Sequence, residues 1–131
     1  MINFVTGGTG FIGKRLICAL QKERIIVRLL SRKKLNKNTI VCDLKVDSIP
    51  DDSLIGVDTI FHLAGFSHDM RDATKIQNIY QRVNVDATIR LAKLAVKSNI
   101  KKFIFVSSVK AGGAPDFGVC ESEKDQGDPE G

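Results

Sequence analysis

Residues 2–13, with the sequence INFVTGGTGFIG, decide the fold of this 131-residue chain. They begin with Ile2–Thr6, a short run of the residue types that favour β-strands. Three glycines follow, each separated from the next by two residues: Gly7, Gly10 and Gly13. Over residues 11–21 apolar side chains recur at helical spacing: Ile12, Leu16, Ala19 and Leu20. The pattern therefore predicts a strand, a glycine turn and a helix in direct succession.

A glycine turn between a strand and a helix is typical of dinucleotide-binding sites. One glycine allows the tight turn, the second a close backbone approach to a pyrophosphate, and the third close packing of helix on strand. The helix then presents backbone N–H groups and the positive end of its dipole to the phosphates. The alternative is a turn that needs only positive φ angles. Our predicted phosphate-binding set is Gly7, Gly10, Phe11, Ile12 and Gly13.

A second nucleotide motif overlaps the first. Residues 8–14 match the GxxxxGK part of a nucleoside triphosphate P-loop, in which a Ser or Thr must follow the lysine to ligate magnesium. Arg15 stands at that position. Kinase or ATPase chemistry is therefore disfavoured.

The rest of the chain continues the alternation of short apolar runs with helical segments. The runs that predict further strands are residues 25–30, 39–42, 59–63 and 103–106. Residues 44–57 predict a loop with one helical turn, and residues 72–98 a helix that is apolar around much of its circumference. Parallel βαβ units, and so an α/β fold, explain this order most economically. Glycines, prolines and acids over residues 112–131 predict a polar loop or disordered tail.

The charge distribution favours a phosphate-bearing ligand. The net charge is +5, yet residues 116–131 carry six acids against Lys124, which leaves +10 on residues 1–115. The densest basic cluster, SRKKLNK at residues 31–37, follows the second predicted strand. An acid there selects NAD and an arginine accommodates the 2′-phosphate of NADP. Ser31 and Arg32 therefore favour NADP over NAD, and the alternative is a solvated run of charges.

Composition excludes several other classes of protein. The length fits one domain with one hydrophobic core. No apolar run approaches the roughly 20 residues that span a bilayer, and the first residues lack the pattern of a secretion signal, so we expect a cytoplasmic protein. Nucleic-acid binding is disfavoured because aromatic residues make up only 6% of the chain. We expect structural thiols at Cys18, Cys42 and Cys120, and no metal site at His62 and His68, which lack a third donor at ligand spacing.

The motifs together resemble the extended short-chain dehydrogenase/reductases, also described as the NAD-dependent epimerase/dehydratase or nucleotide-sugar epimerase family. The resemblance rests on ordered blocks between residues 2 and 113: TGGTGFIG at 6–13, CDL at 42–44, FHLAG at 61–65, RVNVDAT at 82–88 and KKFIFVSSVKAGG at 101–113. It implies a Rossmann-like parallel sheet of about five strands in the order 3-2-1-4-5. It also implies an NAD or NADP cofactor and a nucleotide-sugar or similar carbonyl or alcohol substrate.

The resemblance also assigns roles to individual residues. Asp43 and Leu44 would contact the adenine, and Leu63, Ala64 and Gly65 would line the cofactor ribose and pyrophosphate. Asn84 matches the structural asparagine of the family, the alternative being that it only caps or interrupts a helix. Ser108 matches the serine that hydrogen-bonds the reacting oxygen, with Ser107 as the neighbouring candidate. The alternative for both serines is that they only terminate a strand.

The catalytic YxxxK pair of the family is missing from this sequence. The only tyrosine is Tyr80, and Asn84 stands four residues later. We therefore expect the N-terminal portion of a longer enzyme, with a cofactor-binding domain over residues 1–113 and an acidic tail over residues 114–131. The alternative is a non-catalytic dinucleotide-binding or redox-sensing module. In either case the fifth strand becomes an exposed apolar edge, through which we expect self-association.

Overall fold

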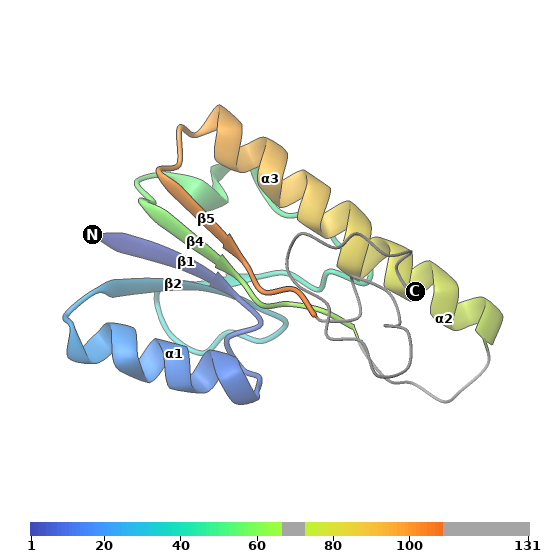
Figure 1. The fold of residues 1–131 in the computed structure, drawn as a ribbon, viewed down its shortest axis with the longest axis horizontal. Coiled ribbons are helices and arrows are strands. Elements are labelled where there is room, and N and C mark those ends of the chain that lie inside the picture. The colour runs from blue at the N-terminus through green and yellow to red at the C-terminus, as the bar shows by residue number, and fades with distance from the viewer. Residues whose placement is uncertain (67–72, 109–131) are drawn as a thin grey trace, which may run out of the picture.

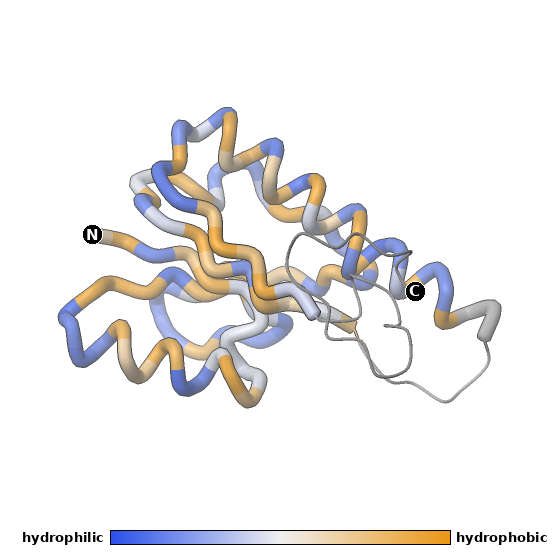
Figure 2. Tube along the Cα trace, in the orientation of Figure 1, coloured by the Kyte–Doolittle hydropathy of each residue, from blue (hydrophilic) through white to orange (hydrophobic). Residues whose placement is uncertain are grey.

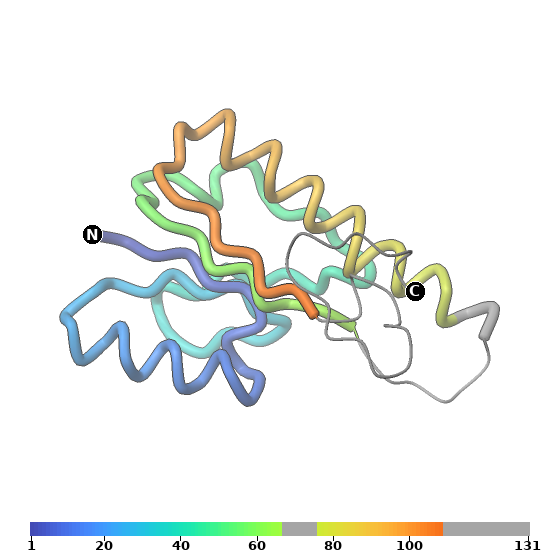
Figure 3. The backbone as a smooth tube through the Cα atoms, viewed as in Figure 1, coloured from blue at the N-terminus to red at the C-terminus, as the bar shows by residue number. Residues whose placement is uncertain are grey.

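The computed structural model describes residues 1–66 and 73–108, which form a parallel five-stranded sheet with helices on both faces (Figure 1). The strand order is β3-β2-β1-β4-β5, which confirms the expected Rossmann-like α/β fold. The strands are β1 (Ile2–Thr6), β2 (Ile26–Ser31), β3 (Thr39–Val41), β4 (Thr59–His62) and β5 (Lys102–Phe105). All four pairings are parallel, so the carboxyl ends of all five strands lie at the same end of the sheet, as the backbone trace in Figure 3 shows.

Two helical layers cover the sheet. Helix α1 (Phe11–Lys22) lies on one face, and the opposite face carries α2 (Ala73–Tyr80), the π-helical turn η2 (Gln81–Asp86) and α3 (Ala87–Lys97) (Figure 1). The 3-10 turn η1 (Asp51–Leu54) confirms the helical turn predicted within residues 44–57. The helix predicted over residues 72–98 is present but contains the π-helical turn. A pattern of apolar residues does not reveal such a change in backbone hydrogen bonding.

The hydrophobic core lies in two layers, one on each side of the sheet. Phe4 and Val5, neighbours in β1, are both fully buried and belong to different layers. Phe4 packs in the layer that includes Leu91 and Leu94 of α3, and Val5 packs with Leu20 of α1. Figure 2 shows the corresponding apolar colouring along the strands. A strand buried on both faces reads as a continuous apolar run, which is why β1 was recognisable from the sequence.

Burial separates the apolar side chains of α3 and the cysteines into two groups. Helix α3 is apolar around much of its circumference, but Ile89 and Val96 are 49% and 79% exposed. Only the stripe that faces the sheet is buried. Cys18 is exposed on α1, so the expectation of a structural thiol holds for the buried Cys42 but not for Cys18. Cys120, His68 and the predicted tail over residues 112–131 lie outside the described residues.

The turn between β1 and α1 depends on the missing Cβ atoms of two glycines. Gly7 has a φ of +68°, and a Cβ there would lie 2.6 Å from the backbone nitrogen of Ala64. Gly13 is buried in the first turn of α1, where a Cβ would lie 2.5 Å from the Cα of Gly8 and would also meet the carbonyl oxygen of Gly7. Neither backbone neighbour can move without the strand or helix moving with it. These glycines therefore set the distance between the start of α1 and the edge of the sheet.

The core contains one histidine, His62, at the end of β4. Its side chain is fully buried, and burial lowers the pKa of its imidazole from 6.5 to about 4. The ring stacks on Phe105, with the centroids 5.6 Å apart, and meets the edge of Phe103 at 6.3 Å. The imidazole is therefore neutral at pH 7.

We predict that Gly13→Ala destabilises the chain by about 2 kcal/mol, because the added methyl group meets backbone rather than a movable side chain. The direction of the change in stability is informative, because a Gly→Ala substitution in an exposed helix stabilises by roughly 1 kcal/mol. Gly65→Ala is the control, because its Cβ would meet only Asn84 Oδ1 at 3.7 Å. Urea unfolding of both variants measures the difference. Equal stabilities for Gly13→Ala and Gly65→Ala would contradict the close packing described here.

We also predict a stability loss of about 3 kcal/mol between pH 6.5 and pH 4 from His62 alone. The unfolded chain takes up a proton at the ordinary histidine pKa of 6.5, whereas the folded chain takes it up only near pH 4. The unfolded state therefore binds more protons in this window, and stability falls as the pH falls. The free energy of unfolding can be measured by denaturant titration at a series of pH values. We expect His62→Phe to lack this part of its pH dependence.

The carboxylate of Asp58 titrates below that window. The pKa of Asp58 lies below its ordinary 3.8, because the Ile2 N–H and the Lys101 ammonium hydrogen-bond its carboxylate. The stability it contributes is therefore lost at a lower pH than the part due to His62. An unchanged slope between pH 6.5 and pH 4 in His62→Phe would contradict the assignment.

Candidate functional site

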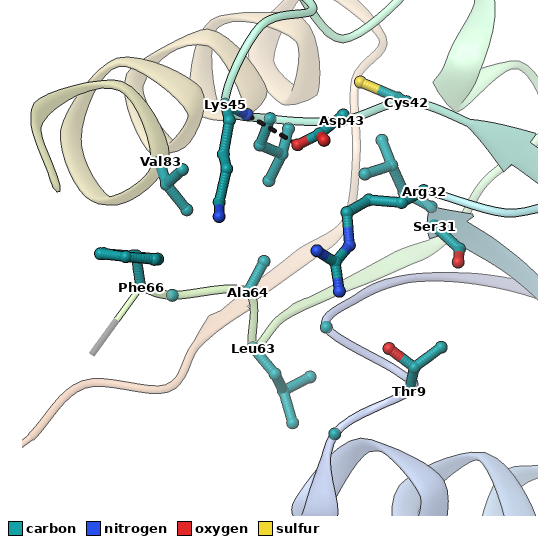
Figure 4. Close-up of a pocket in the computed structure, with 15 residues that line it drawn as sticks. Thr9, Ser31, Arg32, Cys42, Asp43, Lys45, Leu63, Ala64, Phe66 and Val83 are labelled. Carbon is teal, nitrogen blue, oxygen red and sulfur yellow. Dashed lines mark hydrogen bonds between the residues drawn. The ribbon is translucent and has the colours of Figure 1, made fainter. Parts of the chain in front are cut away.

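A pocket of about 410 Å³ opens at the carboxyl ends of the strands (Figure 4). Its walls come from the glycine turn after β1 and from the segments that follow β2, β3 and β4, with Val83 of η2 closing one side. The lining residues are Gly7, Thr9, Gly10, Leu30, Ser31, Arg32, Cys42, Asp43, Leu44, Lys45, Leu63, Ala64, Gly65, Phe66 and Val83. Ligands of doubly wound α/β folds bind in a crevice at this edge of the sheet.

The glycine turn places the start of α1 beside the pocket. The amide of Gly10 donates to the carbonyl of Gly7 at 3.0 Å, which closes the turn. The first helical hydrogen bond runs from Lys14 N to Gly10 O, also at 3.0 Å. The amides of Phe11 and Ile12 therefore precede the intrahelical bonds, and Gly10 supplies no side-chain cap. This end of α1 can donate hydrogen bonds to an anionic group.

The loop after β3 is held by its own acids. Asp43 Oδ1 accepts a hydrogen bond from Lys45 N at 3.0 Å, and the amide of Asp43 donates to Asp47 Oδ2 at 2.7 Å. Burial, followed by the charges of Asp47 and Asp43, raises the pKa of the Cys42 thiol to about 11. Cys42 is therefore an inert, protonated wall of the pocket.

Two cationic side chains face the pocket from different strands. In Figure 4 the Arg32 side chain extends into the pocket from the end of β2, and the Lys45 side chain extends into it from the loop after β3. Lys45 Nζ lies 4.9 Å from the centre of the Phe66 ring. Asp43 is the only carboxylate among the lining residues that the structure describes. The pocket therefore combines cationic groups with a single acid, an arrangement suited to a phosphate-bearing ligand that also carries a hydrogen-bond donor.

Residues 63–66, which follow β4, form the floor of the pocket and are fixed by hydrogen bonds to two distant segments. The amide of Ala64 donates to Thr6 Oγ1 at 3.1 Å. The side chain of Asn84 pairs with the backbone of Phe66, accepting from its N–H at 2.7 Å and donating to its carbonyl at 2.9 Å. Asn84 therefore holds this loop against η2.

The predicted site residues fall into two groups. Those that line the pocket are Gly7, Gly10, Ser31, Arg32, Asp43, Leu44, Leu63, Ala64 and Gly65. The others are not among its lining residues. Phe11 and Ile12 expose their side chains at the start of α1, Gly13 lies behind the turn, and Ser107 and Ser108 are exposed where the chain leaves β5.

Sequence reasoning did not identify every lining residue. It missed Thr9, Leu30, Cys42, Lys45, Phe66 and Val83 as parts of the site. Most are immediate neighbours of predicted positions at strand ends, so extending each strand end by a residue or two would have found them. Val83 is different because it comes from η2, and only its position beside Asn84 pointed to it.

No group of three or more His, Cys, Asp or Glu side chains within residues 1–66 and 73–108 is arranged to hold a metal ion. Over the same residues, no helix has the length and apolar character needed to cross a membrane.

Comparison with known proteins places this architecture in a family. The model of the NAD dependent epimerase/dehydratase family matches residues 3–130. UDP-glucose 4-epimerase of Vibrio cholerae is 34% identical over 115 residues, which are 83% of this chain and 35% of that protein. A 3-beta-hydroxysteroid dehydrogenase of Mycolicibacterium neoaurum is 30% identical over 115 residues, 79% of this chain and 31% of that protein.

Solved structures give the same result. The structure of MoeE5 in complex with UDP-glucose and NAD superposes with a TM-score of 0.82 at 30% identity, and the match covers 98% of this chain and 43% of that one. The chain thus spans about a third of the length of these curated relatives. The match over nearly all of its residues, together with the strand order and the glycine turn, shows that the chain belongs to the NAD-dependent epimerase/dehydratase family.

Proposed function

We propose that the chain binds NAD(P) in this pocket, with the diphosphate bridge at the start of α1. The observation that carries the proposal is the glycine turn itself. It joins Gly10 of the pocket lining directly to the start of α1, where the amides of Phe11 and Ile12 precede the helical hydrogen bonds, and glycine at positions 7 and 10 leaves backbone rather than side chain facing a ligand. Such a cradle fits a diphosphate, because it combines N–H donors with the positive end of a helix dipole.

The adenosine half of the cofactor fits the other end of the pocket. Asp43 supplies a carboxylate for the exocyclic amine of the adenine, and Leu44 supplies an apolar contact beside it. Leu63, Ala64 and Gly65 would then line the ribose and pyrophosphate from below. The cofactor would supply hydride transfer, and these residues would bind it and orient it.

We further propose that NADP is preferred over NAD. Arg32 extends from the end of β2 into the pocket, where its planar guanidinium can bond two oxygens of a 2′-phosphate. An acid at this position would favour the free ribose hydroxyl instead, and the chain has Ser31 and Arg32 there. The NAD in the MoeE5 structure belongs to that protein and does not decide the preference of this one.

The parent activity that these features support is the conversion of a nucleotide sugar, or a similar carbonyl or alcohol, by an NAD(P)-dependent epimerase, dehydratase or reductase. The Vibrio cholerae relative and MoeE5 with UDP-glucose support this substrate class. Ser108 is our candidate for the hydroxyl that hydrogen-bonds the reacting oxygen, with Ser107 beside it. A non-catalytic binding module is the second candidate, because the only tyrosine, Tyr80, is followed four residues later by Asn84 rather than by a lysine.

We predict that calorimetric titration of the chain finds NADP bound more tightly than NAD. Arg32→Ala should weaken NADP binding by about tenfold or more, the usual effect of removing a charge-assisted hydrogen bond, and leave NAD binding nearly unchanged. Lys33→Ala is the matched control, because Lys33 is exposed and does not line the pocket. Equal or tighter binding of NAD would refute the preference. Failure of both cofactors to bind at millimolar concentration would refute the proposed function.

We also propose that the chain self-associates through β5. This strand pairs only with β4 within the described residues, and Ile104, Phe105 and Val106 are 38%, 51% and 44% exposed. Unpaired backbone groups beside exposed apolar side chains favour pairing with a second chain.

Sedimentation equilibrium should therefore detect dimers or larger species at micromolar concentration. The substitution Ile104→Lys should shift the chain toward monomers, because a charge at an edge strand opposes pairing. The control is Val96→Lys, at an apolar position of α3 that is 79% exposed. A wild-type chain that sediments as a monomer, or an equal effect of the two lysines, is the result that excludes this surface.

A further inference from the structure

A continuous series of hydrogen bonds runs through the buried ring of His62. Thr6 Oγ1 lies 2.6 Å from His62 Nδ1, and Thr88 Oγ1 lies 2.8 Å from His62 Nε2. At one end the amide of Ala64 donates to Thr6 Oγ1 at 3.1 Å, and at the other Thr88 Oγ1 donates to the carbonyl of Asn84 at 2.9 Å. The series thus links β1, β4, η2 and α3, and both of its ends reach residues that shape the pocket floor.

The two end groups determine where every proton in the series lies. The carbonyl of Asn84 can only accept, so the hydroxyl proton of Thr88 points to it, and Thr88 Oγ1 must accept from His62 Nε2–H. With its proton on Nε2, the ring has an unprotonated Nδ1, so Thr6 donates its hydroxyl proton to Nδ1 while its Oγ1 accepts from the amide of Ala64. One neutral tautomer, with the proton on Nε2, therefore satisfies every group.

A charged imidazole does not fit this arrangement. A second ring proton on Nδ1 would point at Thr6 Oγ1 and displace the hydroxyl proton of Thr6 from its acceptor. Burial opposes the charge as well, because the groups that the structure describes around the ring are hydroxyls and the aromatic rings of Phe103 and Phe105, none of which carries a charge. The ring therefore remains in one state across the neutral pH range.

We propose that His62 is a positioning residue of the cofactor pocket: its neutral Nε2–H tautomer, held between Thr6 and Thr88, fixes residues 63–66. The role in cofactor binding rests on the proposed function, whereas the fixed loop does not. The backbone of Leu63 and Ala64 lies directly against Gly7, where a Cβ would be 2.6 Å from both the Leu63 carbonyl carbon and the Ala64 nitrogen. A loop that loses its anchor therefore also disturbs the glycine turn that we assign to the diphosphate.

The test compares Thr88→Val with Thr88→Ser in the full chain. Valine has nearly the shape of threonine but leaves the His62 Nε2–H without an acceptor, whereas serine keeps the hydroxyl. We expect Thr88→Val to bind NADP about tenfold more weakly in calorimetry, and Thr88→Ser to bind it within about twofold of wild type. We also expect faster hydrogen exchange at the Ala64 and Phe66 amides in Thr88→Val.

Hydrogen exchange at the Phe4 amide, in the centre of β1, distinguishes a local effect from general destabilisation. The proposal requires the Ala64 amide to exchange faster in Thr88→Val while the Phe4 amide is unchanged. Nitrogen-15 NMR of the His62 ring in the wild-type chain tests the tautomer without any variant, and the expected result is a protonated Nε2 and an unprotonated Nδ1 at pH 7. That measurement still decides the matter if Thr88→Val does not fold.

A protonated Nδ1 at pH 7, or wild-type exchange at Ala64 and Phe66 in Thr88→Val, would overturn the proposal. Wild-type NADP affinity in Thr88→Val would also overturn it. If the wild-type chain binds neither NADP nor NAD, the proposed function fails, and the exchange and tautomer measurements still decide whether His62 fixes the loop.

Discussion

The close approach of two backbone segments, the turn after β1 and the end of β4, is the constraint on which the rest of the structure depends. At Gly7 no side chain can fit, because a Cβ would lie 2.6 Å from the nitrogen of Ala64. Gly13 imposes the same restriction between α1 and the turn. Together these contacts bring the first amides of α1 close to the carboxyl ends of the parallel strands. Neither the helix nor the strands would form the pocket alone.

Hydrogen bonds of polar groups fix two of the loops that line the pocket. The loop after β3 is shaped by the hydrogen bonds of Asp43, and the loop after β4 by Asn84 and by the series through His62. The cationic side chains of Arg32 and Lys45 line the same pocket. The pocket therefore combines a hydrogen-bonded backbone with cationic side chains, which suits a molecule with several phosphates.

Most of the fold could be predicted from the sequence because the strands are short apolar runs, of which β1 and β4 are buried on both faces, and the glycine spacing located the turn before α1. The π-helical turn η2 could not be predicted, since it changes backbone hydrogen bonding and not apolar periodicity. The exposure of Val96 could not be predicted for a related reason: an apolar residue on a helix does not reveal which face meets the sheet. Val83 in the pocket wall and the partners of His62 depend on contacts between distant segments, which one sequence does not encode locally.

Diphosphate binding at the glycine turn is tested most directly by titrating the nitrogen-15-labelled chain with NADP and following the amide chemical shifts. The largest shifts are expected at Phe11 and Ile12, where the start of α1 would donate to the diphosphate, with smaller shifts along the rest of α1. Saturable shifts elsewhere, with the amides of Phe11 and Ile12 unmoved, would contradict binding at the glycine turn, because the ligand would then bind without using it.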